Sequence, residues 1–94
     1  MSSGDGDGIR RNQDVFREVN ERVAAITAEQ NETTSGFLCE CGREDCTSSI
    51  ELSLDEYRKI RANPEHYVAA PGHCVENIDR MVESRESYEI VAQL

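Results

Sequence analysis

The side chains best suited to chemistry in this sequence are cysteines and histidines, and most of them lie in two groups. Cys39, Cys41 and Cys46 form a C-x-C-x4-C cluster, and Gly72-His73-Cys74 supplies two more donors far along the chain. Thiolates and imidazole nitrogens are preferred zinc ligands, and structural sites take four of them in a tetrahedron. Donors in two separated groups therefore predict one structural Zn²⁺.

The spacing leaves the fourth ligand open between His73 and Cys74. Gly42 and Gly72 stand beside the candidates, where the backbone must bend tightly, and glycine permits this at little steric cost. The C-x-C step is shorter than the commoner C-x2-C knuckle. The competing interpretation is ordinary buried cysteines or one disulfide, which is disfavoured because cytosolic proteins rarely keep disulfides.

The same cluster argues against catalysis. Four protein ligands leave no position for the water that catalytic zinc holds, so a hydrolase is disfavoured. Glu40, Glu44 and Asp45 alternate with the cysteines, and we expect them to be solvated surface charges, since catalytic carboxylates usually have a burial-shifted pKa. The sequence has no phosphate-binding glycine loop, Ser-His-Asp pattern or dinucleotide fingerprint, and so predicts no enzyme.

One amphipathic helix is predicted over 9–30, after an acidic Gly/Ser/Asp tail over 1–8 that we expect to be disordered. Apolar side chains recur there at helical spacing, at Ile9, Phe16, Val19, Val23 and Ile26. This stripe is expected to pack on the rest of the chain. The alternative is a homodimer in which two copies pair through Phe16, Val19, Val23 and Ile26.

A zinc-stabilised α+β domain is predicted over 37–94, following a polar linker at 31–36. Strands at 37–41 and 49–53 would form a hairpin with cysteines at its tip. Ser53 and Glu56 predict a capping box at the start of a helix from Leu54 to about Ala62, with Leu54, Tyr57 and Ile60 or Arg61 buried. A strand at 66–70 and a hairpin of 79–84 with 87–92 complete a small zinc-ribbon-like antiparallel sheet. His66 is expected to be a surface or packing residue.

Length and charge limit the function further. A chain of 94 residues with 37% hydrophobic residues and no tryptophan has a small core and needs a metal, disulfides or oligomerisation for stability. The net charge of −9 makes binding to a nucleic-acid backbone improbable, because that affinity rests on clustered cations. No apolar run is long enough for a membrane span, and residues 1–8 lack the basic start and apolar stretch of a signal peptide, so we expect a cytoplasmic location.

The run 37–93 resembles a family of small actinobacterial zinc-binding proteins with no established activity. Three stretches carry the resemblance: Phe37-Leu38-Cys39-Glu40-Cys41 with Cys46, Leu52-Ser53-Leu54-Asp55-Glu56-Tyr57 with Arg61 and Pro64, and Ala70-Pro71-Gly72-His73. In that family glutamate usually follows the Pro-Gly-His turn, so Cys74 is a departure. The resemblance implies His73 as fourth ligand, giving the metal set Cys39, Cys41, Cys46 and His73, with Cys74 a spare thiol beside it.

These observations favour a zinc-stabilised interaction or regulatory module that binds a protein partner. A second hypothesis is a redox or metal sensor in which Cys74 attacks an oxidised ligand thiolate and expels zinc. A third is an acidic mimic of nucleic acid that occupies the groove of a basic protein.

Overall fold

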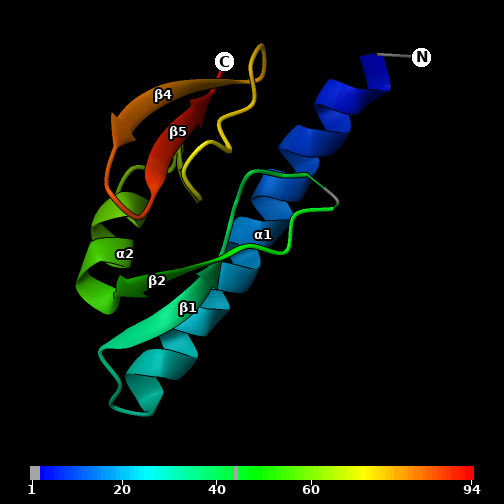
Figure 1. Cartoon of the computed structure of the whole chain (residues 1–94). Helices are drawn as coiled ribbons and strands as arrows, with labels where there is room; N and C mark the ends of the chain where they lie inside the picture. Colours follow the sequence, from blue (N-terminus) through cyan, green and yellow to red (C-terminus); the bar gives the residue numbers. More distant parts are fainter. Residues whose placement is uncertain (1–2, 44) are drawn as a thin grey trace.

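The computed structural model describes residues 3–43 and 45–94, with side chains from residue 8 onward. Within these ranges the elements follow in the order α1 (Ser3–Glu29), β1 (Thr34–Leu38), β2 (Ser49–Ser53), α2 (Leu54–Arg61), β3 (His66–Ala69), β4 (Asp79–Ser84) and β5 (Glu89–Gln93). The predicted α+β class is confirmed. The molecule measures 46 × 22 × 22 Å, and α1 runs along its length (Figure 1).

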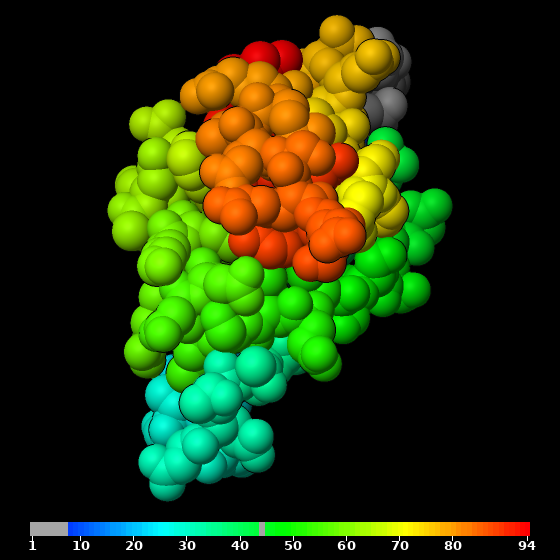
Figure 2. All heavy atoms as spheres, turned by 60° about the vertical axis from the view of Figure 1, so that its left-hand side comes forward, coloured from blue at the N-terminus to red at the C-terminus, as the bar shows by residue number. Residues whose placement is uncertain are grey.

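The strands form two antiparallel sheets where one was expected. β1 pairs with β2 from Thr34↔Ser53 to Leu38↔Ser49. The second sheet has the order β3-β5-β4, and its β4–β5 pairing confirms the predicted C-terminal hairpin. In Figure 2, β4 crosses the front of this face in orange, while residues near the end of α1 and the start of β1 project at the lower end.

The first strand lies earlier than predicted. β1 is Thr34–Leu38, so the expected linker 31–36 contributes residues to it and the expected strand 37–41 does not continue to Cys41. The cause is a change of partner after Cys39, whose amide still donates to the Ser48 carbonyl at 3.1 Å. The Glu40 amide instead donates to the Val68 carbonyl of β3 at 2.7 Å. The cysteines therefore lie where the chain crosses from one sheet to the other.

The second helix confirms the capping-box prediction. The Glu56 amide donates to Ser53 Oγ at 3.1 Å, and the Ser53 amide donates to Glu56 Oε1 at 3.2 Å. The buried residues of α2 are Leu54, Tyr57 and Ile60. Tyr57 stacks on Phe37 of β1 with ring centroids 4.4 Å apart, which joins α2 to the β1–β2 sheet in one core.

The packing face of α1 differs from the predicted apolar stripe. Val19 and Ile26 are 40% and 51% exposed, so the stripe does not pack as a whole. The buried residues of this helix are Gln13, Asn20, Ala24 and Thr27. The prediction from apolar periodicity failed here because the surface facing α1 carries backbone and carboxylate groups, which need polar partners.

The start of α1 also differs from expectation. Residues 3–8 were predicted to be a disordered tail, but the helix begins at Ser3. Extending an existing helix fixes one residue for each hydrogen bond gained, whereas starting a new helix costs several residues for the first bond. Residues 1 and 2 lie outside the described part of the chain. Among the described residues, no helix has the length and apolar character required to cross a membrane.

At Gly42 the helix α1 lies directly against the cysteine segment. It has φ 82°, a left-handed conformation that favours glycine. A Cβ atom added there would lie 2.4 Å from the Ile9 carbonyl oxygen and 2.9 Å from Gln13 Cγ. Asn12 Nδ2 donates to the Gly42 carbonyl at 3.0 Å. A side chain at position 42 would therefore push α1 away.

We expect Gly42→Ala to destabilise the protein more than Gly72→Ala. Gly72 also has positive φ, at 83°, but an added Cβ there meets no atom within 4 Å. The backbone strain, about 1–3 kcal/mol, is common to both variants, while overpacking against α1 adds about 1–3 kcal/mol at Gly42 alone. Denaturant unfolding of the two variants measures the difference, and equal losses would show that α1 does not press on Gly42.

Candidate metal centre

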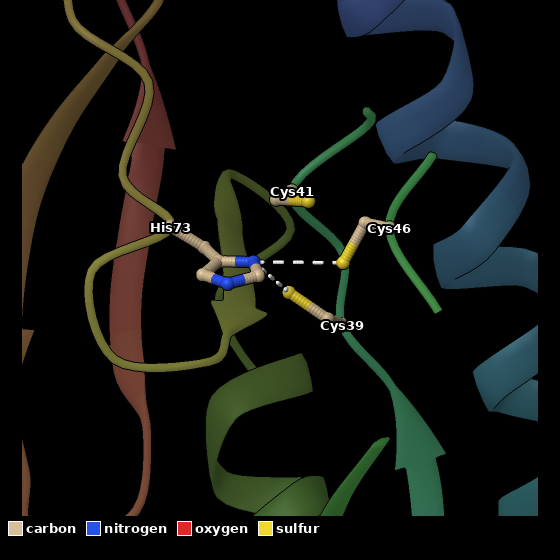
Figure 3. Close-up of side chains that lie close together, drawn as sticks. All are labelled: Cys39, Cys41, Cys46 and His73. Atoms are coloured by element: carbon tan, nitrogen blue, oxygen red, sulfur yellow. Dashed lines mark hydrogen bonds between the residues drawn. The ribbon is translucent and has the colours of Figure 1, made fainter. Parts of the chain in front are cut away.

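Three cysteines and one histidine converge where the β1–β2 hairpin meets the loop after β3. Cys39 and Cys41 follow β1, Cys46 lies in the loop before β2, and His73 lies between β3 and β4 (Figure 3). Their ligand atoms all lie within 4.8 Å of one another. Segments far apart in sequence thus present four metal-binding donors to one point.

The distances fit a tetrahedral ion. His73 Nδ1 lies 3.4 Å from Cys39 Sγ and 3.5 Å from Cys46 Sγ. In a tetrahedron with metal–sulfur bonds of about 2.3 Å and metal–nitrogen bonds of about 2.0–2.1 Å, the sulfur–nitrogen edge is about 3.5–3.6 Å. Nδ1 therefore faces the thiols at the spacing that a shared ion requires (Figure 3).

The thiols lie in an environment that favours a negative charge on at least one sulfur. Cys39 is 3% exposed and Cys41 fully buried. A hydrogen bond from the Cys39 side chain lowers the pKa of Cys41, and the same bond, with burial, raises the pKa of Cys39. The Ala70 amide donates to Cys39 Sγ at 3.1 Å. Because the thiolate is the form that binds metal, this polarisation prepares the cluster for a cation.

A tight turn positions His73, as the Pro71-Gly72 pair predicted. The His73 amide donates to the Ala70 carbonyl at 3.0 Å, with proline second, and glycine at positive φ third, which is the pattern of a type II turn. The Gly72 amide donates to Glu89 Oε2 of β5 at 3.0 Å. The turn is thus fixed to the second sheet while its imidazole points back at the cysteines.

Cys74, the other candidate for fourth ligand, is not a member of the group of four within the described residues. The pKa of its thiol is raised by burial and by the nearby carboxylates Asp79, Glu89 and Glu76. The raised pKa keeps the metal-free thiol protonated and so disfavours it as a nucleophile. Its rejection as a ligand rests on its place outside the group of four donors. His66, expected to be a surface or packing residue, is half-buried and contacts Asn63.

The prediction for Glu40 is wrong. This residue was expected to be a solvated charge, but it is 0% exposed. Burial raises its pKa, against the opposing effect of hydrogen bonds from Asn20 and Val68 and of the Arg61 charge. Arg61 Nη1 lies 3.7 Å from Glu40 Oε1. Asp45 is exposed as expected, and Glu44 lies outside the described residues.

One sequence signal could have found this buried carboxylate. In extended backbone, successive side chains point to opposite sides. In the strand predicted over 37–41, Cys39 and Cys41 would therefore share one face and Glu40 the other. In the structure this segment leaves the strand after Leu38, and the Glu40 side chain contacts Asn20 of α1 and Val68 of β3, on the side away from the metal site. The position of Glu40 between two candidate ligands, rather than its residue type, was therefore the signal that its side chain could be buried.

No known family model matches the chain, and comparisons with curated proteins and with solved structures give no significant match. The resemblance to an actinobacterial family stays a prediction.

We expect Cys46→Ser and His73→Ala each to abolish stoichiometric zinc binding, while Cys74→Ser keeps it. Removing one of four donors opens the coordination sphere, whereas Cys74 is outside it. Zinc-to-protein ratios after gel filtration against a weak chelator, read by elemental analysis, measure the effect. Zinc lost by Cys74→Ser and retained by His73→Ala would reverse the ligand assignment.

Proposed function

We propose that this chain is a small module that binds a protein partner and whose fold is stabilised by one structural zinc ion held by Cys39, Cys41, Cys46 and His73. The single observation that carries the proposal is the convergence of these four donors within 4.8 Å. A donor set of three sulfurs and one imidazole suits zinc, which accepts soft and borderline ligands in a tetrahedron.

A structural role fits the position of the cluster better than a catalytic one. The donors come from both sides of the junction between the two sheets, so an ion there would cross-link β1–β2 to the β3 side of the molecule. In a chain this small, the free energy of zinc binding is a large share of the free energy of folding, on the order of 10 kcal/mol in zinc peptides. Four protein donors also leave no open position for substrate.

The environment of Cys74 weighs against the redox-sensor hypothesis. A resolving cysteine attacks as thiolate, and burial, together with three nearby carboxylates, raises the pKa of this thiol. The interaction role is supported by the acidic surface, with net charge −9, which favours a partner with a basic surface through electrostatic complementarity.

Cobalt substitution tests whether the site is closed. We expect the Co²⁺-loaded protein to show the intense visible bands of a tetrahedral thiolate site, unchanged by added azide or thiocyanate, because no coordination position is free. His73→Ala, which opens one position, is the matched control: at a Co²⁺ excess high enough to load its weakened site, its bands should respond to the same anions. Bands that shift with azide in the wild-type protein would indicate an open, catalytic type of site and contradict the structural role.

A further inference from the structure

Two amide side chains on α1 are buried without any exposed surface. Gln13 and Asn20, two helical turns apart, are each 0% exposed, whereas a surface helix usually buries an apolar stripe. A buried amide is unfavourable unless its donors and acceptors are paired. The partners of these two side chains therefore show what α1 is built to hold.

Asn20 holds the segment that carries Cys39 and Cys41. Its Oδ1 accepts from the Leu38 amide at 2.8 Å, and its Nδ2 donates to the Leu38 carbonyl at 2.9 Å. The amide thus pairs with the end of β1 as a neighbouring strand would. Nδ2 also donates to Glu40 Oε2 at 2.7 Å, so both of its donor positions are used next to the candidate ligands.

Glu40, which accepts from Asn20, also binds β3. Its Oε1 accepts from the Val68 amide at 3.0 Å, and its own amide donates to the Val68 carbonyl. Because Glu40 lies between Cys39 and Cys41, fixing its side chain and its amide fixes the backbone that aims both sulfurs.

Gln13 connects α1 to the loop that carries His73, the candidate ligand from the other side of the centre. Its Nε2 donates to Asp79 Oδ1 at 3.0 Å, and its Oε1 accepts from Gln93 Nε2 at 2.9 Å. The second oxygen of Asp79 accepts from the Val75 amide at 3.2 Å. Asp79 thereby restrains the loop that carries His73, and Gln13 ties that loop to α1.

We propose that Asn20 and Gln13 are positioning residues of the metal centre, so that docking of α1 and binding of zinc favour one another. One helix restrains both ligand-bearing segments, and the hydrogen bonds of the two amides go to groups other than the four ligand side chains. Coupling of this kind is reciprocal: whatever α1 adds to zinc affinity, zinc adds to the docking of α1. This inference rests on the zinc site proposed above.

Thr27 provides a matched control on the same helix. It is also buried, at 6% exposure, but its Oγ1 donates to the Val23 carbonyl within α1. Thr27→Ala therefore perturbs a buried position of α1 without touching either ligand segment.

The test is zinc affinity of the full-length chain, measured by competition with a chromophoric chelator. We expect Asn20→Ala and Gln13→Ala each to weaken zinc binding by about 10- to 100-fold, the usual effect of removing a group that orients metal ligands. Thr27→Ala should leave zinc affinity within about twofold of wild type, the scale expected for a site that shares no partner with the ligand segments. In the Co²⁺ form, the visible bands should shift in the two amide variants and not in Thr27→Ala.

The outcomes separate this inference from the function on which it rests. Wild-type protein that binds no zinc would overturn the proposed function. Wild-type protein that binds zinc, with Asn20→Ala and Gln13→Ala equally tight, would overturn the positioning role alone. An equal loss of zinc affinity in all three variants would show that the loss comes from the general packing of α1. That result would also overturn the positioning role. Should Asn20→Ala not fold, Gln13→Ala decides the question by the same criteria.

Discussion

A carboxylate with no exposed surface must have both oxygens paired, and in this chain that requirement organises the fold around Glu40. An unpaired charge in such a place would cost several kcal/mol. Satisfying it brings together Asn20 of α1, the Val68 amide of β3 and the Arg61 guanidinium of α2. Three elements that are distant in sequence therefore meet on one side chain, and the cysteines on either side of it are positioned as a consequence.

Zinc and this polar network have complementary roles in our account. The ion would join the hairpin cysteines to the loop after β3 on one side of the Cys39–Cys41 segment, while Glu40 joins the same segment to α1, α2 and β3 on the other. A small chain with few aromatic side chains has limited apolar area to bury. Directed bonds to a metal and to a buried carboxylate can supply both the stability and the fixed geometry that a larger core would give.

The sequence predicted what depends on local rules. The capping box at Ser53 and Glu56 predicted the correct first residue of α2, and the Pro71-Gly72 pair predicted the turn before His73. Two strand-like segments at 79–84 and 87–92 predicted the C-terminal hairpin. Type and spacing identified Cys39, Cys41 and Cys46 and left the fourth ligand open between His73 and Cys74, and the choice of His73 came from a resemblance. The end of β1 could not be predicted, because it depends on Val68, a partner that only the tertiary fold brings to Glu40. The prediction of which face of α1 is buried failed for the same reason. Apolar periodicity cannot detect buried amides that pair with the backbone of another segment.

X-ray absorption spectroscopy at the zinc edge of the purified full-length protein tests the central claim most directly. We expect three sulfur atoms at about 2.3 Å and one nitrogen at about 2.0–2.1 Å, with the multiple-scattering signature of a single imidazole. A shell of four sulfurs would place Cys74 in the site instead of His73. A shell dominated by oxygen and nitrogen would contradict the metal centre altogether.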